Sequence, residues 1–206
     1  MPKLNDEEFL QLVEKVIAFH TKRAPGIAIS VEMVNQAKER LGDVPKLCAI
    51  AETRACLPDS IQYLLGCTIG NGELKILDSI GRFALTLYNR KDGKGVRIYV
   101  DQNKIDKEKY SELYKFFRRE RSEAVRNFGP ERKVSNAQVV KEFVDCGRDI
   151  FTIEDVVIKD TSKPPILDCG ICEKCGESYT KHSSDEKLCL YCSGQQAYYD
   201  SVKKEN

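Results

Sequence analysis

The chain has 206 residues, 41% of them hydrophobic, and its 33 lysines and arginines almost balance 32 aspartates and glutamates, which leaves a net charge of +1. This composition is typical of a globular protein, and the balanced charge excludes a general attraction to nucleic acid or to an anionic membrane. The first residues lack the basic and apolar regions of a signal peptide, and no segment reaches the ~18 apolar residues that span a bilayer, so we expect a cytoplasmic protein with no membrane partner. In that reducing compartment its nine cysteines point to metal binding or thiol chemistry rather than to disulfides.

The first third of the chain predicts three helices and one strand. The expected elements span residues 5–20, 25–42, 46–52 and 58–66. Asn5 and Glu8 have the spacing of a capping box, and the apolar residues after them recur at helical spacing. Pro25 opens the second helix, and Gly42 is placed to end it.

Beyond residue 70 the apolar period changes to two, which predicts strands. The expected strands span residues 72–79, 82–90, 95–101 and 151–159. Asp92 and Gly93, between the second and third of these, are typical of a hairpin turn. Ser135 and Gln138 form a second capping box, which predicts a helix that starts there and ends at Gly147.

A helix that follows Asp106 is expected to carry an apolar face. Its members are Tyr110, Leu113, Tyr114, Phe116 and Phe117. Because this charge-rich segment offers few local packing partners, we expect the face to pack on a second copy of the chain, which predicts a homodimer. The alternative is that the face covers the sheet of its own chain.

Three arginines follow that face, at positions 118, 119 and 121. Glutamates 112, 120 and 123 are interleaved with them. Since neighbouring opposite charges on a helix neutralise each other, we interpret the cluster as a solvated helix end rather than a phosphate site.

Two adjacent prolines near residue 165 continue neither a helix nor a strand, and they mark a boundary between domains. We expect a core domain over residues 1–160, a linker over residues 161–168 and a four-cysteine zinc-finger domain over residues 169–206.

The C-terminal domain carries two Cys-x2-Cys pairs, the number and pairing of thiolates that tetrahedral Zn²⁺ accepts. The expected ligands of one structural zinc ion are Cys172, Cys175, Cys189 and Cys192. Gly176 lets the chain turn after the first pair, so that pair is preferred to one with Cys169, although Cys169 and His182 stay open as substitute ligands.

The residues after the second pair, 193–205, are long enough for a short helix, as in a treble-clef or zinc-ribbon finger. Residues 165–206 hold more acidic than basic side chains, which disfavours nucleic acid as a partner of this finger.

A second constellation lies in the core domain, where His20, Cys56 and Cys67 offer an imidazole and two thiols. If the fold brings them together they form a metal or thiolate site. Taken singly, each is more often structural, because a half-buried cysteine serves as a small hydrophobe and a histidine at a helix end as a capping cation.

Four motifs resemble those of the E-subunit-like proteins of formylmethanofuran dehydrogenase. They read FHTKRAPG at residues 19–26, ETRACLPDSIQ at 52–62, LGCTIGNG at 65–72 and LYNRKDGKG at 87–95. The resemblance implies an α+β core with helices packed on an antiparallel or mixed sheet, a dimer, and a metal or active site built from His20, Cys56 and Cys67 with Asp59 nearby. Lys22 and Ala24 stand where this family has a second histidine and a cysteine, so a second, core metal ion would be weakly held.

Three functional hypotheses are consistent with these features. The first is a two-domain zinc protein with a degenerate His/Cys core pocket and a finger that is structural or binds a protein partner. The second is a thiol- or metal-dependent enzyme, or a redox protein, that uses Cys56 or Cys67 with His20, and in which His20 or Lys22 lowers the pKa of the thiol. The third, a nucleic-acid-binding regulator that acts through the finger, is disfavoured by charge.

Overall fold

The structure is a computed structural model that describes residues 5–127, 129–163 and 165–200. It divides the chain into two compact units, one that ends at Ser162 and one that begins at Lys163. This division falls inside the segment that the sequence predicts as a linker. No helix in the described parts of the chain is long and apolar enough to cross a membrane.

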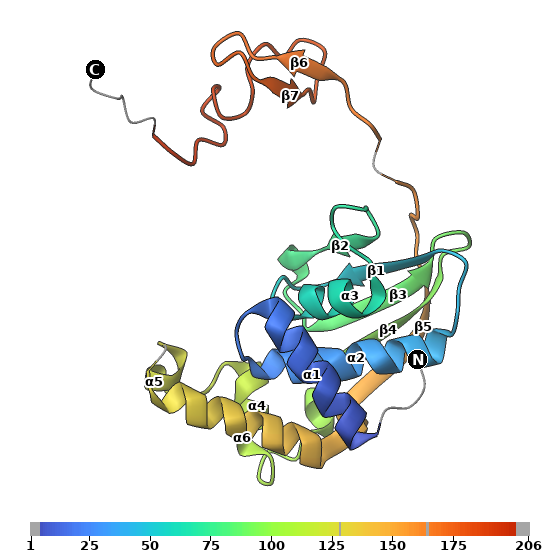
Figure 1. Ribbon diagram of the computed structural model, residues 1–206, viewed down its shortest axis with the longest axis vertical. Helices are drawn as coiled ribbons and strands as arrows, with labels where there is room; N and C mark the ends of the chain where they lie inside the picture. The colour runs from blue at the N-terminus through green and yellow to red at the C-terminus, as the bar shows by residue number, and fades with distance from the viewer. Residues whose placement is uncertain (1–4, 128, 164, 201–206) are drawn as a thin grey trace. The chain divides into compact units, whose positions relative to one another are not determined.

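The first unit is built on a mixed sheet of five strands (Figure 1). In spatial order these are β2 (Leu74–Ile76), β1 (Leu47–Ala51), β3 (Ala84–Asn89), β4 (Lys94–Val100) and β5 (Phe151–Val157). β1 and β2 are parallel, and every other neighbouring pair is antiparallel. β3 and β4 form the predicted hairpin, in which Gly93 has the positive φ of 73° that this turn requires.

Three helices cover one face of this sheet (Figure 1): α1 (Asp6–His20), α2 (Pro25–Leu41) and α3 (Leu57–Leu65). α2 and α3 pack on the strands, and α1 packs on both helices. α2 supplies much of the core, because Ile27, Val31 and Met33 are completely buried. The capping box of Asn5 and the stop at Gly42 are both confirmed. The predicted α+β class is therefore confirmed.

Three more helices follow the sheet's hairpin: α4 (Ser111–Arg118), α5 (Glu123–Arg126) and α6 (Glu131–Cys146). Three 3-10 helices connect elements: η1 (Asp78–Ile80), η2 (Gln102–Lys104) and η3 (Gly147–Ile150). The predicted start of α6 is wrong, because the helix begins at Glu131, one turn before Ser135. Ser135 does not cap it: its hydroxyl donates to a Glu112 carboxylate oxygen at 2.7 Å and accepts from Arg121 Nη1 at 3.0 Å.

The apolar face of α4 packs within its own unit. Leu113 is fully buried and Tyr110 is buried. The aromatic rings of Tyr114, Phe116 and Phe117 are half-buried against the same core. The alternative open from the sequence, that this face covers the protein's own chain, therefore accounts for it, and the face gives no reason to expect a homodimer.

The second unit contains a two-stranded antiparallel sheet of β6 (Cys169–Ile171) and β7 (Ser178–Thr180). Residues 190–196 form turns and residues 197–200 have no regular structure. The short helix expected over residues 193–205 is therefore wrong as far as residue 200, and its remaining part lies outside the described residues.

Candidate metal centre and core site

Four cysteine sulfurs gather in the second unit. The Sγ atoms of Cys172, Cys175, Cys189 and Cys192 all lie within 4.8 Å of one another. Cys172 directly follows β6, and the chain then turns through Gly176, whose φ is 75° and whose N–H donates to the Cys172 carbonyl oxygen at 2.9 Å. Gly176 thus has the role expected from the sequence, and the two Cys-x2-Cys pairs face each other.

Backbone N–H groups point at these sulfurs. The N–H of Cys189 donates to Cys172 Sγ and that of Cys192 donates to Cys189 Sγ, each at 3.4 Å. N–H groups of Cys175 and Cys189 lower the pKa of Cys172 to about 6. Burial and the neighbouring sulfurs raise the pKa of Cys192 to about 12. Because a metal binds thiolates, a cluster that holds one thiolate and crowds three more thiols beside it fits a cation that replaces the remaining protons.

The two substitute ligands stand apart from this group. Cys169 is exposed in β6, and His182 is exposed with its backbone N–H bound to Glu186. Among the described residues, the four cysteines are the one set of three or more potential ligands close enough to hold a single ion.

In the core unit, His20, Asp59 and Cys56 form a row. His20 is the last residue of α1, Cys56 is the N-cap of α3, and Asp59 lies in the first turn of α3. His20 Nδ1 lies 2.6 Å from Asp59 Oδ2, and His20 Nε2 lies 4.0 Å from Cys56 Sγ. With Asp59 accepting the Nδ1 proton, Nε2 is left as a base that faces the thiol.

Cys56 has an unusual backbone. Its φ of 52° and ψ of −48° place it at the centre of a tight turn in which the N–H of Leu57 donates to the Ala55 carbonyl oxygen at 2.5 Å. A side chain at positive φ costs about 1–3 kcal/mol, and such residues cluster at functional sites. Gly26 packs against this thiol, because a Cβ atom at position 26 would lie 2.9 Å from Cys56 Sγ.

The Cys56 thiol is protonated at neutral pH. Burial raises its pKa to about 11, and the negative charge of Asp59 acts in the same direction. The sequence-based expectation that His20 or Lys22 lowers this pKa is not met. Lys22 is exposed and lines a different groove, together with residues of α1 and α6.

Cys67 does not join this row. It follows α3 while Cys56 precedes it, and the nine residues of that helix span about 13 Å, against the roughly 4 Å that separates two ligands of one ion. Cys67 is buried, with its Sγ 3.8 Å from the Leu47 carbonyl oxygen, and burial raises its pKa to about 12. Cys48, Glu73 and Arg90 lie close enough to influence its charge. The three residues that the sequence groups together therefore occupy two places in the core.

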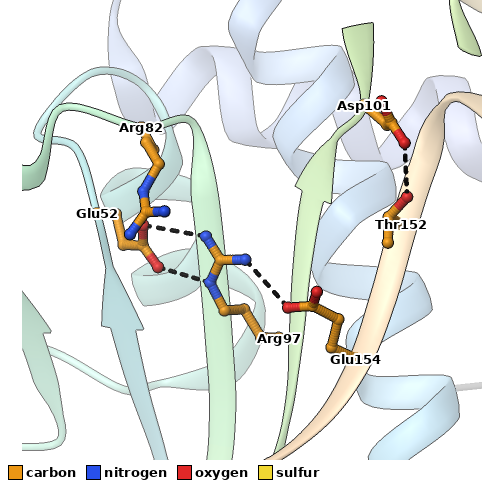
Figure 2. Close-up of polar contacts among 6 residues, drawn as sticks. All are labelled: Glu52, Arg82, Arg97, Asp101, Thr152 and Glu154. Carbon is orange, nitrogen blue, oxygen red and sulfur yellow. Dashed lines mark hydrogen bonds and ion pairs between the residues drawn. The ribbon is translucent and has the colours of Figure 1, made fainter. Parts of the chain in front are cut away.

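Sequence reasoning missed a charged network on the face of the sheet opposite α2. Glu52, which opens the ETRAC motif, is buried and accepts from Arg97 Nε at 2.7 Å and from Arg82 Nε at 2.8 Å. Figure 2 shows Arg97 between Glu52 and Glu154, whose carboxylate lies 3.2 Å from Arg97 Nη1. Glu52 lies at the end of a strand pattern, which was the available signal.

The fold and these sites define a helix-covered mixed sheet joined to a four-cysteine module. The family described as "FmdE, Molybdenum formylmethanofuran dehydrogenase operon" matches residues 19–158. The chain belongs to this family.

Two known proteins are similar over most of the chain. The crystal structure of a tungsten formylmethanofuran dehydrogenase FmdE-like protein from Syntrophus aciditrophicus is 33% identical, with a TM-score of 0.78, and the match covers 97% of this chain and 100% of that one. A probable S-adenosyl-L-methionine-binding protein of Archaeoglobus fulgidus is 33% identical over 208 residues, which cover 93% of this chain and 54% of that protein. The chain thus spans about half the length of this curated relative.

Proposed function

We propose that this protein is a two-domain zinc protein, in which a finger over residues 169–206 holds one structural Zn²⁺ ion per chain and is tethered by residues 161–168 to the α+β core. The observation that carries the proposal is the packing of four cysteine sulfurs within 4.8 Å of one another. Four thiolates in two pairs are the ligand set of structural zinc sites.

The second unit needs such a crosslink. Of its described hydrophobic side chains, that of Cys172 is the one that is buried. A segment this small buries too little apolar surface to fold alone, so binding of zinc supplies its folding free energy. The role we assign to the finger is structural, or the recruitment of a protein partner, because its acidic composition does not suit nucleic acid.

Zinc content tests this assignment. Protein purified without chelator should contain about one zinc per chain by elemental analysis, because apparent binding free energies of structural zinc reach about 10–16 kcal/mol at neutral pH. Changing both Cys172 and Cys175 to serine should remove it.

The matched control is Cys169→Ser, which leaves the four-sulfur group intact and should keep its zinc. Full occupancy in the double variant would show that the ligands are assigned to the wrong cysteines. A second tightly held ion in the wild-type protein would show that the core also binds metal.

For the core we propose a degenerate His/Cys pocket made by His20, Cys56 and Asp59 rather than a second metal site. Asp59 occupies one nitrogen of His20, and Cys67 lies beyond the far end of α3, so two ligand atoms at most face a common point. Zinc sites in proteins use three or four protein ligands.

A second candidate, a thiol-dependent enzyme, is favoured by one observation, the Cys56–His20–Asp59 row at a strained turn. In that case the Cys56 proton moves to His20 Nε2, Asp59 stabilises the imidazolium, and the thiolate attacks an electrophilic carbon of the substrate. The raised pKa of Cys56 requires substrate binding to bring the thiol and the imidazole closer.

Alkylation rates separate the two candidates. Because its pKa is raised to about 11, Cys56 of the zinc-loaded protein should react with iodoacetamide with a midpoint near that pH, measured residue by residue by mass spectrometry. Asp59→Asn should lower the midpoint, since it removes a negative charge beside the thiol. A resting midpoint at or below pH 7 would favour the enzyme.

Two coarser expectations complete the proposal. A cytoplasmic location is supported by the nine cysteines, all of which are free in the structure. A homodimer is retained on the family resemblance alone, and a monomeric mass by light scattering at micromolar concentration would remove it.

A further inference from the structure

The proposed function does not use a groove of about 1270 Å³ in the first unit. Seven arginines line it: Arg82, Arg97, Arg118, Arg119, Arg121, Arg126 and Arg132. Glu154 is the one carboxylate among the described residues of its wall, and Cys56 also lines it. This local density of positive charge contrasts with a chain whose net charge is +1.

Three of these arginines are neutralised by carboxylates. Glu52 binds both Arg82 and Arg97, and Glu154 binds Arg97 as well (Figure 2). Arg118 Nε lies 2.7 Å from a Glu120 carboxylate oxygen. These residues therefore form a wall with little net charge.

Three other arginines differ from these. Among the residues that the structure describes, no ion pair involves Arg119, Arg121 or Arg126. The interleaved glutamates point elsewhere, because Glu112 accepts from Ser135 and Glu123 accepts from Asn127. Glu120 alone pairs with an arginine, so the sequence-based interpretation of a neutralised, solvated helix end does not hold for this side of the groove.

Arg121 is held in place by neutral groups. Its Nη1 donates to Ser135 Oγ at 3.0 Å and to Asn136 Oδ1 at 2.9 Å, and its guanidinium lies 4.9 Å from the centre of the Phe116 ring. Burial and the positive charge of Arg132 lower the pKa of Arg121. A bound anion would relieve this repulsion, and it would meet a guanidinium whose orientation is already fixed.

Aromatic rings line the same groove. Phe117 contacts Phe116 and Phe83 edge to face, with ring centroids 5.2 Å and 5.8 Å apart. Such a wall suits a flat, apolar group, whereas the guanidinium groups suit phosphate oxygens, which they bind as bidentate donors.

We propose that this groove binds a small organic diphosphate with a planar ring, whose phosphates lie on Arg119, Arg121 and Arg126 and whose ring lies on Phe83 and Phe117. Pockets for molecules of this size combine an apolar wall with a few fixed polar groups. The site is independent of the finger, so it can fail while the zinc assignment holds, and the reverse.

Isothermal titration calorimetry of the full zinc-loaded chain tests the site, with pyrophosphate and a nucleoside diphosphate (ADP) as probes. Changing both Arg119 and Arg126 to glutamine should weaken binding of each probe at least tenfold. The matched control changes Arg40 and Arg54 to glutamine: it removes the same charge from exposed arginines outside the groove, and affinity should stay within twofold.

Phe117→Leu tests the ring. It should weaken ADP severalfold and leave pyrophosphate unchanged, a difference that general destabilisation would not produce. The absence of binding of either probe at millimolar concentration overturns the proposal, as does an equal loss in the control variant. Tighter binding of a single-stranded oligonucleotide than of ADP, with a steep salt dependence, also overturns it, since the groove would then serve nucleic acid.

Discussion

Gly26 and Cys56 lie so close together that each restricts what the other can be. A Cβ atom at position 26 would lie 2.9 Å from Cys56 Sγ and 3.1 Å from Cys56 Cβ. Gly26 belongs to α2, a helix buried over its first four turns, so it cannot move away without disturbing the core. Cys56 in turn is fixed by its own tight turn at the start of α3.

Gly26→Ala is therefore expected to destabilise the core. In an unobstructed helix this change would stabilise by about 0.5–1 kcal/mol, whereas overpacking a core costs about 1–3 kcal/mol. We expect a net loss of about 1–2 kcal/mol in the free energy of unfolding. Urea unfolding followed by far-UV circular dichroism measures it, since the described α-helices all lie in the first unit.

A double-mutant cycle with Cys56→Ala provides the control. That change removes the sulfur but not Cys56 Cβ, so Gly26→Ala should cost at least ~1 kcal/mol less in the Cys56→Ala background than in the wild type. A Gly26→Ala protein as stable as the wild type in both backgrounds would contradict the close packing.

At the scale of elements, Glu52 links β1 to β4 across β3, on the face of the sheet opposite α2. Its side chain is buried, and burial alone would raise its pKa, but hydrogen bonding and charge from Arg97 and then Arg82 hold the pKa below its usual value. A carboxyl whose pKa is lower when folded adds stability above its unfolded pKa of about 4.3, and this is lost as the pH falls through the folded pKa.

Glu52→Gln should therefore destabilise the core by roughly 1–3 kcal/mol at pH 7, because it leaves Arg97 half-buried without its main partner. The difference from wild type should shrink below about pH 4, where Glu52 of the wild-type protein also becomes neutral. Urea midpoints at both pH values measure the effect. Glu154→Gln is the matched control: its carboxylate is exposed, so less than about 1 kcal/mol is expected.

The elements also show which parts of the fold local sequence patterns can predict. The sequence predicts α1 and α2 at both ends, because Asn5, Pro25 and Gly42 act on their own helices. It does not predict the start of α6, because the Ser135 hydroxyl binds Glu112 and Arg121, which belong to other segments. α5 has four residues and no periodic pattern that could reveal it.

The same distinction applies to the candidate sites. The four finger cysteines lie on one short segment, so their spacing alone predicts the cluster. In the core, the spacing of Cys56 and Cys67 does not reveal that α3 separates them, and His20 reaches Cys56 through tertiary packing. The arginine groove combines β-strand, loop and helix residues, and its charge depends on where each glutamate points, which no local pattern determines.

At the scale of the whole molecule, the two units differ in what stabilises them. The first has a continuous hydrophobic core between α2 and the sheet. In the second, the described side chains include one buried hydrophobic residue, Cys172, which is also a proposed metal ligand. Loss of the metal should therefore affect one unit only.

Chelation of zinc should unfold the second unit and leave the first intact, because the finger has no other source of folding free energy. In amide hydrogen exchange, the β6–β7 hairpin should lose its protection when the metal is removed, while β3 and β4 keep theirs. The urea midpoint of the core should not move. Added zinc should restore hairpin protection, which separates metal loss from thiol oxidation, and a hairpin that stays protected in the chelated, reduced protein would show that it folds without metal.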